Sequence, residues 1–157
     1  MTLLKKELKK ELHKLINNNI RLRFYGDTEM LSQDIRSLIQ ESEEQTANFN
    51  GLQVNIMFNY GSKNELNAAV KSIVKQGVKE TDITEELINQ SLYTKDLPDP
   101  DILIRPGGEH RLSNFMLWQC AYTELFFTDT LWPDFSLDEL LIIIKTFQER
   151  HRRFGGL

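Results

Sequence analysis

Hydrophobic residues recur along the chain at two spacings, and these spacings predict alternating helices and strands. Helical spacing occurs in residues 1–16, in residues 33–50 after a candidate N-cap at Ser32, and in residues 62–78. It returns in 83–92 as short helical turns and in 137–154, where Ser136 and Glu139 match a capping box. The chain is therefore expected to be rich in amphipathic helices.

Between these helices lie short apolar runs that end at glycine or at charged residues. They occupy residues 20–25, 52–60, 102–105 and 124–131, and each is expected to form a strand. Alternating strands and helices favour parallel pairing through right-handed crossovers, and apolar strands favour burial on both faces. The sequence predicts an α/β fold with an open, mainly parallel sheet and flanking helices.

Two helical faces and one further helix can be assigned in more detail. The face of 33–50 is expected to consist of Ile35, Leu38, Ile39 and Ser42, and that of 62–78 of Leu66, Ala69, Val70, Ile73 and Val74. Residues 113–122 are also expected to begin as a helix, with Cys120 as a small apolar core residue.

Composition narrows the class of protein. The chain has 157 residues, 40% of them hydrophobic and 27% charged, which suits a single domain over 1–157. A net charge of −4 argues against nucleic acid as a partner, because nucleic-acid surfaces are usually basic. The single cysteine cannot form an intramolecular disulfide, which favours a reducing, cytoplasmic location.

No apolar run approaches the roughly 20 residues that a membrane-spanning helix needs. The first predicted helix is basic and amphipathic, so it could lie on an anionic membrane, although packing of its leucines on a sheet is the favoured interpretation. The expectation is a soluble protein, with peripheral membrane contact left open.

The candidate site is the stretch DPDILIRPGGEHRLSNF, residues 99–115, which follows an apolar strand. Ligands of parallel sheets collect at the carboxyl ends of strands. Arg105 and Arg111 each offer a planar fork of donors that suits phosphate oxygens. Gly107 and Gly108 permit positive φ, so that their N–H groups could converge on an anion. The loop is expected to bind a diphosphate.

The same loop contains further polar groups. Ser113 and Asn114 add donors, while Glu109 and His110 could orient the arginines or contact a metal. A hard cation such as Mg²⁺ would suit carboxylate and phosphate oxygens together, whereas no His/Cys pattern suits zinc. An alternative remains for each role. The arginines and Glu109 could form an ion-pair network that only fixes the loop, and His110 could be a solvated loop residue and not a metal ligand.

Residues 96–135, DLPDPDILIRPGGEHRLSNFMLWQCAYTELFFTDTLWPDF, closely resemble the C-terminal signature of the cis-prenyltransferases. The segments NNIRLRFYGD, LQVNIMFNYGSKNEL and RHRRFGG occur in the family's order as well. The resemblance covers nearly the whole chain.

This resemblance implies an enzyme that condenses an allylic diphosphate, commonly farnesyl diphosphate, with isopentenyl diphosphate, to make long polyprenyl carriers of cell-wall or glycan precursors. It implies that Arg105, Arg111 and Ser113 hold isopentenyl diphosphate, with Leu112 between them. Glu109 and Asn114 would support the loop.

The resemblance also implies roles beyond this loop. His110 and Glu124 match positions associated with magnesium, together with an aspartate from the family's N-terminal motif. Arg153 and Gly155 match a tail that approaches the partner's diphosphate site in a homodimer.

The chain also departs from the family pattern. It contains no MDGNGRW-like motif and no Phe-Ser-x-Glu-Asn-Trp-x-Arg segment, which supply the allylic site and the proton acceptor in the family. Pro106 stands where threonine is common, and Lys63 where arginine is usual.

The expectation from these departures is the C-terminal portion of an enzyme, incomplete at the N-terminal side of its sheet and inactive alone. Exposed strand edges would then need a homodimer or a complementing N-terminal segment. The alternative is a non-catalytic accessory subunit. A generic nucleotide-binding module ranks last, because no P-loop is present.

Overall fold

The computed structural model describes residues 2–150, and within the first helix it describes side chains from Lys10 onward. The chain divides into two compact units, Met1–Thr94 and Lys95–Leu157. The expectation of a single domain over 1–157 stays a prediction. No described helix combines the length and the apolar character needed to cross a bilayer.

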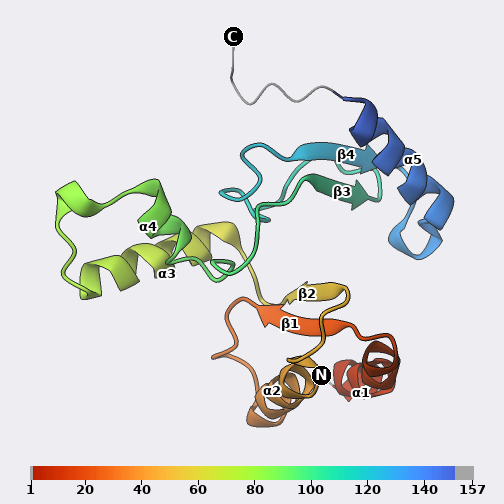
Figure 1. The fold of residues 1–157 in the computed structure, drawn as a ribbon, viewed down its shortest axis with the longest axis horizontal. Helices are drawn as coiled ribbons and strands as arrows, with labels where there is room; N and C mark the ends of the chain where they lie inside the picture. The colour runs from red at the N-terminus through yellow and green to blue at the C-terminus, as the bar shows by residue number, and fades with distance from the viewer. Residues whose placement is uncertain (1, 151–157) are drawn as a thin grey trace. The chain divides into compact units, whose positions relative to one another are not determined.

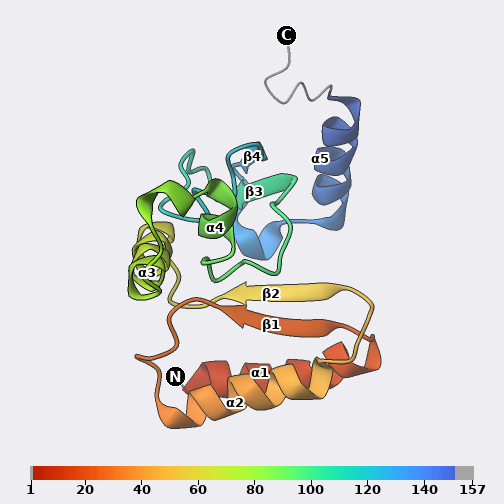
Figure 2. The same cartoon turned by 60° about the vertical axis from the view of Figure 1, so that its left-hand side comes forward.

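The first unit is built around one pair of parallel strands. Its elements are α1 (Thr2–Asn17), β1 (Arg21–Tyr25), α2 (Gln33–Thr46), β2 (Gln53–Met57), α3 (Ser62–Lys75), the 3-10 helix η1 (Glu80–Asp82) and α4 (Glu85–Asn89). β1 and β2 pair with Arg21 opposite Gln53 and Tyr25 opposite Met57. Helices α1 and α2 lie side by side along one face of this pair (Figure 1, Figure 2).

The core of the first unit lies between these helices and the strands. Leu22 and Leu38 are buried at its centre, and partly buried residues pack around them: Leu15, Phe24, Val54 and Ile56. Successive strand residues point to opposite faces, so the other face of the pair carries mainly polar side chains, including Arg21, Arg23, Gln53 and Asn55. No residue of the two strands is fully exposed, so the expectation of burial on both faces stays a prediction, although one face is mainly polar.

Helix α2 buries the face expected from the sequence, and Thr46 adds one more buried residue at its end. In α3 the expectation is only partly confirmed. Ala69 and Ile73 are buried, but Val70 and Val74 are 55% and 70% exposed. The reason is a rotation of the buried face toward Glu65, which is fully buried and whose carboxylate accepts hydrogen bonds from the Tyr60 hydroxyl (2.6 Å) and the Tyr93 N–H (2.9 Å).

The second unit also contains one parallel pair. Its elements are β3 (Ile102–Pro106), β4 (Glu124–Thr128), the 3-10 helix η2 (Trp132–Asp134) and α5 (Leu137–Glu149). Ile102 stands opposite Glu124, and Pro106 opposite Thr128. The Ser136 hydroxyl caps α5 by accepting the Glu139 N–H at 3.2 Å, as expected. The Glu139 carboxylate instead accepts a hydrogen bond from the Thr128 hydroxyl, so the other half of the capping box is not seen.

Residues 113–122 do not form the expected helix but a series of turns. Ser113, Asn114 and Met116 have φ of 48°, 65° and 45°, values in the left-handed region that interrupt a right-handed helix. The connection from β3 to β4 is therefore irregular. Cys120 is buried as expected, and desolvation by burial raises the pKa of its thiol.

The α/β class, with parallel strands and flanking helices, is confirmed. The described strands pair as two separate two-stranded sheets, β1 with β2 and β3 with β4. The first pair is a strand–helix–strand unit in which α2 makes the crossover. The second pair has no helix in its crossover, because of the left-handed residues just described.

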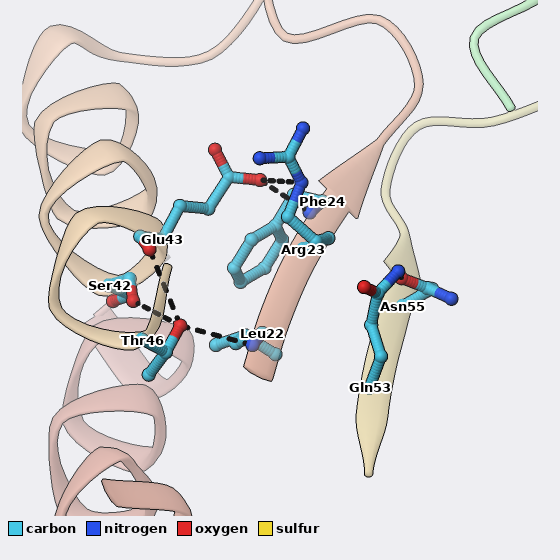
Figure 3. Close-up of polar contacts among 8 residues, drawn as sticks. All are labelled: Leu22, Arg23, Phe24, Ser42, Glu43, Thr46, Gln53 and Asn55. Carbon is cyan, nitrogen blue, oxygen red and sulfur yellow. Dashed lines mark hydrogen bonds and ion pairs between the residues drawn. The ribbon is translucent and has the colours of Figure 1, made fainter. Parts of the chain in front are cut away.

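Helix α2 also closes the outer edge of β1 with hydrogen bonds from its side chains (Figure 3). The Leu22 N–H donates to the Thr46 hydroxyl oxygen at 3.0 Å, and the Phe24 N–H donates to the Glu43 carboxylate at 2.7 Å. The Thr46 hydroxyl in turn donates to the Ser42 carbonyl at 2.9 Å. Strand edges with unpaired backbone groups are costly when buried, so these side chains replace a neighbouring strand.

We expect Thr46→Val to lower the free energy of unfolding by about 1–3 kcal/mol, because it leaves the buried Leu22 N–H without an acceptor while keeping the shape of the side chain. Urea denaturation followed by circular dichroism measures this change. Thr46→Ser keeps the hydroxyl and should cost less than the valine. An equal loss in both variants would contradict a role for the hydroxyl.

Candidate functional site

Arg105, near the carboxyl end of β3, holds the loop that follows it. Its guanidinium donates hydrogen bonds to the Ser113 hydroxyl at 2.8 Å and to the Arg111 carbonyl. The loop therefore turns back over the strand end. Two residues that the sequence assigns to anion binding, Arg105 and Ser113, are in direct contact.

The two glycines of the loop have the positive φ expected, 99° at Gly107 and 72° at Gly108. Their N–H groups do not converge on a free space, however. The Gly107 N–H donates to the Thr130 carbonyl and the Gly108 N–H to the Thr128 carbonyl, both at 2.9 Å. The expected cradle of glycine N–H groups is wrong, because both groups are already bonded within the protein.

The end of β4 and the residues just after it thus fix the glycines, a role that the sequence did not indicate. In the sequence, only the polar run Thr-Asp-Thr at 128–130 pointed to such a role.

Pro106, the last residue of β3, is compatible with the pairing of β3 and β4. The Glu124 N–H donates to the Asp101 carbonyl, so by the alternation of a parallel ladder the Pro106 nitrogen points away from β4. The proline therefore costs no ladder hydrogen bond.

Glu109 and His110 contact different neighbours. Glu109 forms an ion pair with Arg111, and the two side chains are 47% and 63% exposed. The His110 ring stacks on Phe127 with centroids 5.1 Å apart and planes at 20°. Among the described residues, no carboxylate forms an ion pair with Arg105. The Arg-Glu-Arg alternative is thus realised for one arginine only.

A cavity of about 330 Å³ opens beside this loop. Polar groups of Arg105, Arg111 and Ser113 line one part of it, and apolar side chains line the rest: Leu103, Ile104, Leu112 and Phe115. The four residues assigned to isopentenyl diphosphate from the resemblance are therefore brought together. A cavity of this kind suits a small ligand with an anionic head and a short apolar tail. Asn114 follows Ser113 with φ of 65°, at the turn that leaves the cavity.

The two residues assigned to magnesium lie apart. Glu124 begins β4, and its carboxylate accepts a hydrogen bond from Arg150, whose guanidinium lies 4.8 Å from the Phe126 ring centroid. His110 stacks on Phe127, three residues further along the strand, a separation of roughly 10 Å. Side chains three apart on a strand also point to opposite faces. Arg153 and Gly155 lie outside the described residues.

Within the described part of the chain, no three His, Cys, Asp or Glu side chains come together as a metal site. The assignment of His110 and Glu124 to a metal stays a prediction.

A larger cavity, of about 520 Å³, lies at the carboxyl ends of β1 and β2 in the first unit. Its lining includes two carboxylates, Asp27 and Glu29, together with Lys71 and Tyr93. Desolvation by burial raises the pKa of the Tyr93 hydroxyl, and the nearby carboxylates add to this effect. The two carboxylates make this cavity less suited to a diphosphate than the cavity beside Arg105.

Comparison with known proteins identifies the family of the chain. Residues 1–155 match the family model Prenyltransf, described as "Putative undecaprenyl diphosphate synthase". The isoprenyl transferase of Chlamydia trachomatis is 46% identical over 158 residues, which are 98% of this chain and 62% of that protein. The isoprenyl transferase of Helicobacter pylori is 47% identical over 160 residues, which are 100% of this chain and 68% of that protein.

Two solved structures are also similar. A probable undecaprenyl diphosphate synthase from Campylobacter jejuni is 39% identical with a TM-score of 0.86, over 98% of this chain and 72% of that one. Lavandulyl diphosphate synthase from Lavandula x intermedia, solved with dimethylallyl diphosphate, is 31% identical with a TM-score of 0.89. The match covers 96% of this chain and 67% of that one.

The chain thus spans roughly three fifths to two thirds of the length of the curated relatives that it matches. The match to the family model extends over almost all of its residues. The chain belongs to the undecaprenyl diphosphate synthase family, the cis-prenyltransferases.

Proposed function

We propose that this chain provides the isopentenyl diphosphate site of a cis-prenyltransferase. The reaction joins isopentenyl diphosphate to an allylic diphosphate such as farnesyl diphosphate and repeats to give a long-chain, undecaprenyl diphosphate. Such products would carry cell-wall precursors. Support comes from the relatives, which are named isoprenyl transferases, and from the cavity beside Arg105.

The observation that carries the proposal is that the guanidinium of Arg105 has only neutral hydrogen-bond partners among the described residues. Its guanidinium contacts a carbonyl and a hydroxyl, both neutral, so no described carboxylate neutralises its charge. A diphosphate can therefore gain a charge-assisted hydrogen bond without displacing an ion pair. Ser113 and Arg111 stand close enough to contribute further donors from the same loop.

The apolar part of the cavity gives the proposal its substrate class. Leu103, Leu112 and Phe115 line the cavity together with the polar groups. A five-carbon isopentenyl group can lie against these side chains while its diphosphate contacts the arginines. A nucleotide would bring a polar base and sugar to the same apolar surface, which is less favourable.

The chemistry sets the task of these residues. The allylic carbon–oxygen bond breaks and releases pyrophosphate, the double bond of isopentenyl diphosphate attacks the allylic carbon, and a proton is lost. Arg105, Arg111 and Ser113 hold the nucleophilic substrate in one orientation, which lowers the entropic part of the barrier. We propose that the allylic site and the proton acceptor are supplied from outside these 157 residues, so that the chain alone is inactive.

Magnesium would assist the departure of pyrophosphate by neutralising its charge. The described residues do not assemble such a site alone, since Glu124 pairs with Arg150 and lies away from His110. Assembly with a further segment or as a homodimer, with Arg153 and Gly155 near the partner's diphosphate site, is proposed on the family resemblance. A cytoplasmic enzyme in peripheral contact with the membrane would suit a product with a long apolar chain.

Arg105→Ala should weaken binding of isopentenyl diphosphate by about 10- to 100-fold, the value of one or two charge-assisted hydrogen bonds. Isothermal titration calorimetry on the purified chain measures it. Arg105→Lys should give an intermediate loss, because it keeps the charge and loses the fork. Arg36→Ala, which removes an exposed arginine bonded to Gln33, is the matched control and should leave the affinity unchanged. Equal affinity of all variants would contradict the proposed site.

Glu109→Gln separates an anion site from an ion pair that only fixes the loop. The pair with Arg111 is exposed, so its loss should change the free energy of unfolding by less than about 1 kcal/mol. Binding of isopentenyl diphosphate should tighten, because Arg111 is released. Glu11→Gln breaks a comparable exposed pair with Lys14 and should not alter the affinity. A large loss of stability with unchanged affinity would favour the structural role.

Prenyl transfer tests the whole proposal. The purified chain is incubated with farnesyl diphosphate, isopentenyl diphosphate and Mg²⁺, with and without a separately made N-terminal segment of a cis-prenyltransferase. We expect product only with the added segment, and none with Arg105→Ala. If the segment binds and no product forms, the chain is a non-catalytic accessory subunit instead.

A further inference from the structure

Glu139, in the first turn of α5, bonds outside its own helix. The Ser136 hydroxyl accepts the Glu139 N–H at 3.2 Å, which is one half of a capping box. In the other half, the glutamate carboxylate would accept the N–H of the capping serine. Here the carboxylate instead accepts a hydrogen bond from the hydroxyl of Thr128, the last residue of β4. A departure of this kind from a local pattern often marks a functional site.

The Thr128 side chain is fixed by two hydrogen bonds. Its hydroxyl donates to Glu139 and accepts the Thr130 N–H at 3.2 Å. A hydroxyl has only one proton, so the contact with Glu139 determines which way its oxygen lone pairs point, and one of them meets Thr130. The bond to a carboxylate is also charge-assisted and therefore stronger than one between neutral groups. Glu139 thereby stabilises the turn of residues 128–130, which the Thr130 N–H closes.

This turn holds the start of the loop after β3. The carbonyls of Thr128 and Thr130 accept the N–H groups of Gly108 and Gly107, both at 2.9 Å. The contact is close, because a Cβ added at Gly108 would lie 3.3 Å from a carboxylate oxygen of Asp129. A shift of the turn therefore moves the two glycines with it.

The described hydrogen bonds fix the loop at both ends. Its start is held by the glycine N–H groups, and its far end by Arg105, which donates to the Arg111 carbonyl and the Ser113 hydroxyl. Arg111 is three residues beyond Gly108 and lines the cavity. Only a short length of chain separates the turn from a group that faces the ligand, so the position of Arg111 depends on both ends of the loop.

We propose that Glu139 and Thr128 are positioning residues of the isopentenyl diphosphate site. They act through the turn of residues 128–130 and the two glycines, and they place Arg111 without touching the substrate themselves. Every contact in this chain of hydrogen bonds lies within the second unit. The identity of the ligand rests on the proposed function, whereas the control of the loop by Glu139 and Thr128 does not.

Amide hydrogen exchange on the ligand-free, ¹⁵N-labelled chain tests the control of the loop. Thr128→Val should speed exchange at Gly107 and Gly108 by at least about tenfold, because the turn loses both hydroxyl bonds. Thr128→Ser keeps the hydroxyl and should leave these rates close to those of the unmodified chain. Thr123→Val is the matched control, since its hydroxyl donates to the Pro100 carbonyl at 2.7 Å at the opposite end of β4. Equal glycine exchange in the two valine variants would overturn the proposal.

Calorimetric titration with isopentenyl diphosphate tests the effect on the site. Glu139→Ala and Thr128→Val should each weaken binding by about three- to tenfold, the equivalent of one net hydrogen bond. Glu139→Gln retains an acceptor oxygen and should restore most of the affinity, and Thr123→Val should bind as the unmodified chain does. Lower stability of the Glu139→Ala and Thr128→Val variants with unchanged affinity would overturn the positioning role. Failure of the unmodified chain to bind would instead contradict the proposed function, while the glycine exchange still decides whether Glu139 and Thr128 control the loop.

Discussion

Two hydrogen bonds from the Arg105 guanidinium, to the Arg111 carbonyl and the Ser113 hydroxyl, hold the loop after β3 in place. The cavity, its polar rim and the position of Arg111 all follow from this closure of the loop. The donor belongs to a strand, so the site is anchored to a rigid element and not to the loop alone. Because both acceptors are neutral, the charge of Arg105 is held in position without a described carboxylate to cancel it.

Hydrogen bonds to the end of β4 and to the residues after it also hold this loop. The carbonyls of Thr128 and Thr130 accept the two glycine N–H groups, so β4 and the residues after it fix the loop's first half. Thr128 also donates to Glu139, which joins the end of β4 to the first turn of α5. The glycine N–H groups are therefore not available to a phosphate, and the proposed phosphate contacts come from the side chains of Arg105, Arg111 and Ser113.

Much of the fold could be predicted from periodicity. The buried face of α2 and the cap at Ser136 follow from local patterns, which depend on neighbours three or four residues away. The buried face of α3 was misjudged, because a fully buried Glu65 with two hydrogen-bond partners replaces apolar residues there, and those partners lie outside the helix. The turns at 113–122 were missed for a related reason: left-handed residues begin at Ser113, whose side chain contacts Arg105, eight residues away in the sequence.

For the candidate site too, some features could be predicted from the sequence and others depend on how the strands pair. Arg105, Arg111, Leu112 and Ser113 could be assigned from the sequence, and the structure brings them together at one cavity. The use of the glycine N–H groups by residues 128–130 could not be foreseen, since it depends on the pairing of β3 with β4. Strand register likewise separates Glu124 from His110, a relation that their sequence spacing does not contain.

The proposed function depends on direct binding of the diphosphate group by Arg105. The most direct measurement is a nuclear magnetic resonance titration of the ¹⁵N-arginine-labelled chain with isopentenyl diphosphate, observing the guanidinium Nε–H signals. If Arg105 contacts the diphosphate, its signal shifts and saturates with the ligand while the Arg36 signal stays unchanged. Binding of the ligand with no change at Arg105 would contradict it.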